Sequence, residues 1–459
     1  MRFAIALNAA LLTACAVKDP LYCDSNTPCT DSARPFCDMN GEYPASEGIK
    51  HTCIPDPFGP DAGSSGDGGT ARSVAKLTTG KVESCAVLSD GGLRCWGDLG
   101  YGELIGDSEF PREAGDIETG APVAEVAIGD GRTCVRYVAG NVRCWGENET
   151  GILGYGHKQV VTGPPADLPD LELGGPASAI TAGASHFCAL LESGDVRCWG
   201  NNTSGQLGLG HVQPIGDNEV PADEDPVDLG GVVRQLVAGF GHTCVVLEGG
   251  LVTCWGQNTF GKLGYGHEEK VGDDETPAEE GYVNVGGDVE SIAPGLDHTC
   301  AILEGGGVRC WGYALRLGIP GNSNDVGDTE DPATSGTTDI GGTCEQLIVG
   351  DGFTCAVRDD RDVVCWGSVI DGRLGYASPD DNVGDDESPA EQGPVILGGP
   401  VATISTSGGR RGHSCVLLES GDVRCWGDNS SAQLGLGHLD DVGDNETPAS
   451  EEPVQILDP

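Results

Sequence analysis

The chain has 459 residues, with 72 acidic and 25 basic side chains and a formal net charge of −47 at pH 7. Such a surface repels polyanions and offers few cations to displace the counterions of a phosphate backbone, so nucleic acid is excluded as an expected ligand. Twenty cysteines are too many for a reducing compartment unless they bind metal, and their spacing fits strand-to-strand disulfides better, so an oxidising location is expected.

The first 15 residues have the pattern of a bacterial lipoprotein signal peptide. Met1-Arg2 is a short basic start, Phe3 to Leu12 is mostly apolar, and Leu12-Thr13-Ala14-Cys15 closes the run. In such signals cleavage leaves the cysteine as a lipid-bearing N-terminus, so Cys15 is the expected lipidation site. An ordinary secretory signal is the alternative. The apolar run is too short to span a bilayer, and no later stretch is long enough, so membrane attachment is expected through the lipid alone, at the outer membrane or cell surface.

Residues 16–57 are expected to form a small disulfide-rich segment, and residues 58–73 a linker. The segment contains too few apolar residues for a core and is expected to depend on two disulfides. Three pairings are possible for Cys23, Cys29, Cys37 and Cys53, and the sequence does not choose among them. The Gly, Ser and Asp run from Pro60 to Thr70 is typical of a flexible tether.

From residue 74 onward one pattern recurs seven times: a cysteine, nine residues, and Cys-Trp-Gly. All seven tryptophans lie in it, and successive first cysteines are 49, 54, 56, 56, 55 and 60 residues apart, a period in the range of propeller blades. The pairs are Cys85 and Cys95, Cys134 and Cys144, Cys188 and Cys198, Cys244 and Cys254, Cys300 and Cys310, Cys355 and Cys365, and Cys415 and Cys425.

The spacing predicts that the two cysteines of each unit face each other across a hairpin and form a disulfide. In the third unit a three-residue loop, Glu192-Ser193-Gly194, places Cys188 opposite Cys198, within the range that a disulfide accepts. Six units keep a glycine at the third loop position, where the backbone is left-handed. The sixth unit has Arg361 there, so its hairpin is expected to be the least regular.

The complete repeat reads Ala-Gly-x-x-His-x-Cys, a hairpin, then Cys-Trp-Gly-x-Asn-x-x-Gly-x-Leu-Gly-x-Gly. It resembles the repeat of the regulator of chromosome condensation superfamily, which also includes a secreted bacterial propeller that inhibits β-lactamase. The resemblance implies an all-β fold in which residues 74–459 form a seven-bladed β-propeller with a clasp between the chain ends. Pro453-Val454-Gln455-Ile456-Leu457 is expected to complete the blade that Val74-Ala75-Lys76-Leu77 begins.

A second motif, Gly-Asp-x-Glu followed two residues later by proline, recurs in six units. Its two carboxylates and nearby carbonyls fall short of the six to eight oxygens that calcium takes, unless neighbouring blades add more. Calcium is a candidate ligand and no other cofactor is expected; the alternative is that these acids cap backbone amides or face water. The second unit, with His157 and Lys158, lacks the motif and is expected to be the irregular blade. The candidate ligands are Asp107, Glu109, Asp217, Glu219, Asp273, Glu275, Asp328, Glu330, Asp385, Glu387, Asp444 and Glu446.

Histidines recur at equivalent positions in several units, which predicts a structural role because catalysis or zinc binding needs different residue types at one place. No catalytic residue is assigned, since the chain has no nucleophile elbow, phosphate loop or histidine pair at helical spacing. Cys344 is left over and is expected to be a buried free thiol, the alternative being a bond to another chain.

These observations predict an exported, monomeric propeller that is a binding scaffold for an unidentified protein or surface polymer and not an enzyme. A polysaccharide hydrolase or lyase is the alternative from another class, and it would need one non-repeating cluster of carboxylates or histidines near the channel. The resemblance also offers guanine-nucleotide exchange on a small nuclear GTPase, which an exported acidic lipoprotein does not favour. Propeller scaffolds host unrelated activities, so the repeat implies the fold more strongly than the function.

Overall fold

A computed structural model of the chain describes residues 22–23, 51–52, 72–99, 104–377, 382–407 and 412–457. The chain divides into two compact units, Met1–Ala71 and Arg72–Pro459. In the first unit β1 (Tyr22–Cys23) pairs antiparallel with β2 (His51–Thr52). The expected signal peptide and most of the linker lie outside the described residues, as do Cys15, Cys29, Cys37 and Cys53. No helix among the described residues is long and apolar enough to cross a membrane.

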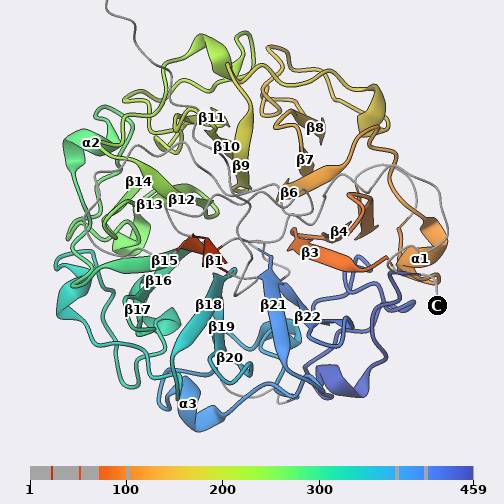
Figure 1. Cartoon of the computed structure of the whole chain (residues 1–459). Coiled ribbons are helices and arrows are strands. Elements are labelled where there is room, and N and C mark those ends of the chain that lie inside the picture. The colour runs from red at the N-terminus through yellow and green to blue at the C-terminus, as the bar shows by residue number, and fades with distance from the viewer. Residues whose placement is uncertain are drawn as a thin grey trace, which may run out of the picture. The chain divides into compact units, whose positions relative to one another are not determined.

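Seven three-stranded antiparallel sheets surround a common axis in the second unit, which is a seven-bladed β-propeller (Figure 1). In each blade the first strand lines the central channel, and the second and third follow outward. Blades 1 to 7 consist of β3 (Val74–Thr79), β4 (Glu83–Leu88) and β5 (Leu93–Gly97); β6 (Val123–Gly129), β7 (Arg132–Tyr137) and β8 (Val142–Gly146); β9 (Ala177–Ala182), β10 (His186–Leu191) and β11 (Val196–Gly200); β12 (Val233–Ala238), β13 (His242–Leu247) and β14 (Val252–Gly256); β15 (Val289–Pro294), β16 (His298–Leu303) and β17 (Val308–Gly312); β18 (Cys344–Val349), β19 (Phe353–Arg358) and β20 (Val363–Gly367); and β21 (Val401–Thr406), β22 (His413–Leu418) and β23 (Val423–Gly427).

In the part of the chain that the structure describes, helical structure is limited to single turns that follow the third strands of the blades. The α-helical turns are α1 (Pro111–Ala114), α2 (Pro277–Glu280) and α3 (Pro389–Gln392). The 3-10 turns are η1 (Pro165–Asp167), η2 (Pro221–Asp223), η3 (Thr259–Gly261), η4 (Ala314–Arg316), η5 (Pro332–Thr334), η6 (Ile370–Gly372) and η7 (Pro448–Ser450). The expected all-β fold is confirmed.

The hairpin of each blade has the register that the cysteine spacing predicts. Cys188 lies opposite Cys198 in the pairing of β10 with β11, and the N–H of Gly194 donates to the carbonyl of Leu191 to close the turn. Every blade contains one disulfide between its second and third strands, with Cα atoms 4.0–4.1 Å apart. The seven disulfides join Cys85 to Cys95, Cys134 to Cys144, Cys188 to Cys198, Cys244 to Cys254, Cys300 to Cys310, Cys355 to Cys365, and Cys415 to Cys425. All seven pairings are those that the sequence predicts.

The sixth hairpin is regular, so the expectation for it was wrong. Arg361 has φ 69°, in the left-handed region that glycine occupies at this position in the other blades. Its N–H donates to the carbonyl of Arg358 at 2.9 Å, and Val357 remains paired with Val363. The flanking strands and the disulfide determine this turn, so the cost of a left-handed backbone, about 1–2 kcal/mol, is borne by Arg361.

A fourth segment completes the outer edge of every blade, and it comes from the same repeat. In blade 3 the N–H of Val227 donates to the carbonyl of Val196 at 2.9 Å. The C-terminal segment does the same in blade 7, where Val454 donates to Val423 at 2.8 Å. Equivalent bonds in the other blades are Ile117 to Leu93, Leu171 to Val142, Val283 to Val252, Thr338 to Val308 and Val395 to Val363.

The chain ends are joined, but not in the way expected for the clasp. The outer edge of β5 is already occupied by Ile117, so the C-terminal segment cannot complete blade 1. Instead, the carbonyl of Gln455 accepts from the N–H of Arg112 at 3.0 Å, and that of Ile456 accepts from the Arg94 guanidinium. Backbone hydrogen bonds equivalent to the one between Arg112 and Gln455 join the other pairs of neighbouring blades. Blade 7 therefore meets blade 1 as any two neighbours meet.

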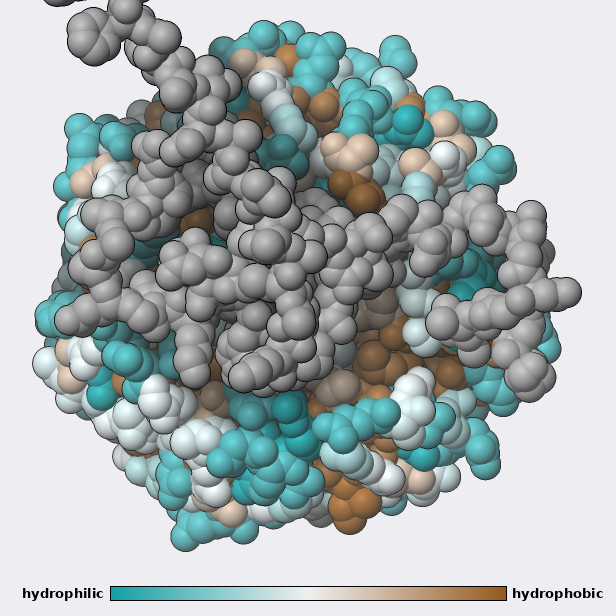
Figure 2. Space-filling model, in the orientation of Figure 1, coloured by the Kyte–Doolittle hydropathy of each residue, from teal (hydrophilic) through white to brown (hydrophobic). Residues whose placement is uncertain are grey.

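The core lies within and between the blades. All seven tryptophans are buried, each next to a disulfide cysteine. The sheet of blade 2 is as regular as the others, so the expected irregularity is not in that blade itself. The visible face of the propeller, apart from residues drawn in grey, is mainly hydrophilic with smaller hydrophobic groups (Figure 2), as the large net charge implies.

Candidate functional site

One end of the ring carries the loops that contain the candidate acidic residues. His186 begins β10 and lies opposite Gly200, which ends β11. The loop before β10 and the segment after β11 therefore leave the blade at the same end, while the hairpin loop 192–194 lies at the other. Gly200 also bridges Ile215, which brings the Gly-Asp-x-Glu motif to this end. We call this end of the propeller the loop face.

The Gly-Asp-x-Glu loops form the contacts between neighbouring blades on the loop face. A Cβ added to Gly205 of blade 3 would lie 2.6 Å from the backbone nitrogen of Asp273 in blade 4. The N–H of Gly210 also donates to the carbonyl of Gly272 at 3.2 Å. Equivalent close approaches occur between blades 2 and 3, 4 and 5, 5 and 6, 6 and 7, and 7 and 1. Close packing of the backbones leaves no room for a side chain, which explains the glycines of the Gly-Asp-x-Glu motif and of the Gly-x-Leu-Gly run that faces it.

The acidic side chains of these loops partly serve their own turns. An Oε1 atom of Glu219 accepts from the N–H of Gly216 at 3.1 Å, and Glu446 accepts from Gly443 in the same way at 3.2 Å. Partial burial, together with the adjacent Asp274, raises the pKa of Glu275 to about 7. The structure thus shows the turn-capping role that was the alternative to calcium binding.

Carboxylates converge at only two of the six candidate calcium loops. One oxygen from each of three residues lies within 4.8 Å of the others in Asp273-Asp274-Glu275 and in Asp385-Asp386-Glu387. Among the described residues, the loops with Asp107, Asp217, Asp328 and Asp444 form no such group. Three carboxylates are fewer ligands than calcium takes, and what faces the loop of Asp273 from the preceding blade is a glycine backbone.

The recurring histidines lie in hydrogen-bonded nodes between blades. The Nε2 atom of His186 is 2.8 Å from Oγ1 of Thr243 in the next blade. That hydroxyl donates to the carbonyl of Gln206, which also accepts from the Trp255 indole at 3.0 Å. Because the hydroxyl proton points to the carbonyl, Nε2 of His186 must carry the proton that it shares with Thr243. The same pairing joins His242 to Thr299, His298 to Thr354 and His413 to Ser84.

Burial favours the neutral form of His186, His242 and His413. Desolvation lowers the pKa of His186 to about 4 and that of His413 to about 4, and it lowers the pKa of His242 well below its usual value. A protonated ring would place an uncompensated charge inside a blade junction. The predicted structural role of these histidines is consistent with these contacts.

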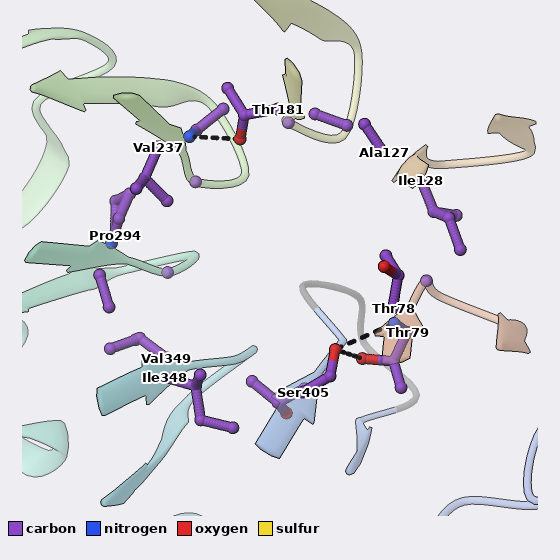
Figure 3. Close-up of a pocket in the computed structure, with 18 of the residues that line it drawn as sticks. Thr78, Thr79, Ala127, Ile128, Thr181, Val237, Pro294, Ile348, Val349 and Ser405 are labelled. Carbon is purple, nitrogen blue, oxygen red and sulfur yellow. Dashed lines mark hydrogen bonds between the residues drawn. The ribbon is translucent and has the colours of Figure 1, made fainter. Parts of the chain in front are cut away.

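The central channel is a cavity of about 400 Å³ lined by the first strands of all seven blades. Figure 3 shows Thr79 and Ser405, whose hydroxyls bond each other across blades 1 and 7, and apolar side chains such as Val237 and Val349 elsewhere on the lining. The Oγ1 atom of Thr181 likewise accepts from the N–H of Ala238 in the next blade at 3.0 Å. These hydroxyls satisfy backbone groups at the edges of the first strands.

One non-repeating buried acid lies between blades 1 and 2 and was missed in the sequence. Glu83 occupies the position that histidine takes in blades 3, 4, 5 and 7, and burial raises its pKa to about 8. Thr133 donates to it at 3.4 Å, and Lys81 pairs with Asp130 nearby at 2.8 Å. Aligning the repeats would have revealed this acid. Glu83 is not among the residues that line the channel.

Cys344 is a buried free thiol, as expected. Its Sγ lies 3.3 Å from the carbonyl of Gln346, and burial raises the pKa of the thiol to about 12. Such a thiol is protonated at neutral pH and is a poor nucleophile.

Comparison with known proteins identifies the repeats. The family model described as Regulator of chromosome condensation (RCC1) repeat matches residues 177–206, 233–262, 289–314 and 404–433. Ultraviolet-B receptor UVR8 of Arabidopsis thaliana is 31% identical over 268 residues, covering 57% of this chain and 56% of the relative. Secretion-regulating guanine nucleotide exchange factor of Bos taurus is 30% identical over 233 residues, covering 50% and 48%. The chain thus spans about half the length of these curated relatives.

Solved structures show the same fold. Human WBSCR16 superimposes with a TM-score of 0.58 at 21% identity, over 74% of this chain and 83% of that one. Prp20p of Saccharomyces cerevisiae does so with a TM-score of 0.56 at 19% identity, over 73% and 80%. The repeat matches, the sequence relatives and the ring of seven blades agree, and this chain contains regulator of chromosome condensation repeats.

Proposed function

We propose that this chain is exported, anchored by a lipid on Cys15, and binds a protein or surface polymer at the cell envelope through the loop face of its propeller. The observation that carries the proposal is the disulfide in every blade. Disulfides persist in oxidising compartments and are rare in the cytosol. Each closes a loop of sequence separation 10, for which the chain-entropy model gives about 3 kcal/mol. The propeller would lose much of its stability where these bonds are reduced.

A binding role is supported by how the recurring residues are used. The described histidines of the β-strands and the glycines of the acidic loops hold neighbouring blades together, so the repeated motifs are explained without a chemical step. The sequence relatives are named as a light receptor and an exchange factor, which shows that the shared fold is compatible with different activities. Loops on a rigid frame are common sites of recognition.

The export proposal is tested by expressing the full chain and its Cys15→Ser variant in a bacterium with an outer membrane. We expect wild type to incorporate a palmitate analogue and to sediment with membranes, and the variant to do neither. Alkylation under denaturing conditions before reduction should leave all fourteen blade cysteines unmodified. Free blade thiols, or wild-type protein without lipid, would refute the proposal.

A further inference from the structure

Among the described residues, the loops that follow Cys-Trp-Gly differ in character from blade to blade on the loop face. In blades 4, 5 and 6 they carry Phe260, Tyr313, Leu315 and Ile370, which we call the apolar patch. The corresponding loops of blades 2, 3 and 7 expose glutamate, threonine and serine instead: Glu149, Thr150, Thr203 and Ser430. The polar loops of blades 2, 3 and 7 show that the framework of the ring does not require apolar side chains at these positions.

The apolar patch is open to solvent. Ile370 is 58% exposed and Leu315 is 40% exposed, while Phe260 and Tyr313 are half-buried. The surface of a chain with net charge −47 gains nothing in solubility from these side chains. Leu315 and Ile370 lie on the loops of adjacent blades, and exposed apolar residues with a polar surround are typical of interaction sites.

The backbone under the patch is strained at two of its three loops. Phe260 has φ 66°, and Asp371, which follows Ile370, has φ 58°. A bulky side chain rarely adopts this conformation; in the loops of blades 2 and 3 only glycines have positive φ, whereas in the loop of blade 7 the small residue Ala432 has φ 61°. Strain that persists in an exposed loop is characteristic of functional positions, because the surrounding structure must enforce it.

Contacts across the junction of blades 4 and 5 hold the aromatic side chains in place. The ring centroids of Phe260 and Tyr313 are 4.9 Å apart, and the Arg316 guanidinium carbon lies 5.7 Å from the centroid of Tyr313. Arg316 in turn approaches Asp297 at 3.9 Å. Aromatic and arginine side chains held in this way are common anchors of binding surfaces, since little conformational entropy remains to be lost on binding.

Buried cations tie the patch loops to their surroundings. The Nζ of Lys262 donates to Oε1 of Gln257 at 2.9 Å and to the carbonyl of Leu296 in the next blade at 2.8 Å. Arg373 donates to the carbonyls of Asp351 and Ile370, each at 2.7 Å. These charges are already used within the protein, so they stiffen the patch and do not attract an anionic ligand.

Acidic loops border the patch on all three blades. The Asp328-Thr329-Glu330 loop packs its backbone against Gly261, directly after Phe260. The N–H of Gly321 donates to the carbonyl of Asp385 at 2.7 Å, and a Cβ on Gly372 would lie 2.7 Å from the nitrogen of Asp444. The middle residues Thr329, Asp386 and Asn445 are exposed, and the acids on either side of them are half-buried. An apolar surface with acidic borders is complementary to an apolar anchor with basic flanks.

We propose that the apolar patch is a docking site for a partner protein segment that presents aromatic or aliphatic side chains flanked by lysine or arginine. The patch supplies the central apolar contact, the acidic loops pair with the basic flanks, and the net negative charge accelerates encounter. This inference rests on the proposed function, because it names the partner chemistry of the loop face.

The test uses the full chain carrying Cys15→Ser, exported so that the disulfides form, and a phage-displayed library of random peptides. We expect selection to enrich peptides with apolar residues next to Lys or Arg, and their affinity to fall with rising salt. The double variant that combines Phe260→Asn with Ile370→Ser should weaken the selected peptides by about tenfold or more. Asparagine tolerates the left-handed backbone at position 260, so this variant keeps the fold. The control is Val212→Ser, an exposed valine of blade 3, which should leave affinity unchanged.

Three outcomes would overturn the inference: no enrichment of basic apolar peptides, equal binding to the double variant, or loss of binding in the valine control. A glycan array that binds wild type and not the double variant would assign the patch to a polysaccharide and also overturn it. Failure of the export proposal is distinguishable, because it would appear as unlipidated wild type or free blade thiols, whatever the peptides do.

Discussion

The buried histidines make the stability of the propeller depend on pH. The pKa of His186 falls from 6.5 to about 4 on folding because the ring is desolvated. The folded state therefore binds fewer protons than the unfolded state between these values. The contribution of the neutral His186 to the free energy of unfolding is complete above pH 6.5 and is lost as the pH falls from 6.5 to about 4. A shift of this size corresponds to about 3 kcal/mol for one fully buried histidine, a substantial part of the usual stability of a domain.

The variant His186→Phe isolates this effect, because blade 6 has Phe353 at the corresponding position. The free energy of unfolding should be measured by denaturant titration, with disulfides intact, at several pH values from 7.5 to 4. At pH 7.5 the free energy of unfolding of the variant should be lower by about 1 kcal/mol, the usual value of one hydrogen bond, because the bond to Thr243 is lost. Below pH 6.5 its stability should fall less steeply than that of wild type, by up to about 1.4 kcal/mol per pH unit.

The comparison with wild type is needed because protonation of the many acids relieves charge repulsion over the same range. The control is His157→Gln, since His157 is exposed and is not one of the histidines that pair with a hydroxyl of the next blade. It should leave the pH dependence unchanged. Identical slopes for wild type and His186→Phe would refute the argument that burial of this histidine links stability to pH.

Three further substitutions test the backbone and disulfide arguments by the same unfolding measurement. Arg361→Gly should raise the unfolding free energy by up to about 1 kcal/mol, because it relieves a left-handed backbone; a loss would show that its exposed ion pairs matter more. Gly205→Ala should cost at least about 2 kcal/mol, and Gly194→Ala less, since only the first meets backbone atoms of the next blade; equal costs would contradict the junction. Cys188→Ala combined with Cys198→Ala should cost about 3 kcal/mol, and an unchanged midpoint would show that the bridge does not constrain the chain.

Local structure was predictable from the sequence because its determinants lie close together in the chain. The register that pairs Cys188 with Cys198 depends only on a short turn between them and on side-chain alternation. The same reasoning failed at Arg361, where the tertiary frame holds a non-glycine residue in the glycine conformation. The free state of Cys344 followed from counting cysteines.

The contacts between blades were decided by the tertiary structure, because they join residues about one repeat apart. The partner of His186 is Thr243, and that of Gly205 is the backbone of Asp273. Neither pair can be read from one repeat, since each residue's role depends on how the next blade packs against it. For the same reason the sequence did not show that the Gly-Asp-x-Glu loops pack at the junctions between blades. The sequence alone determined the strands and disulfides of the blades, whereas the packing of the blades into a ring decided which contacts their repeated residues make.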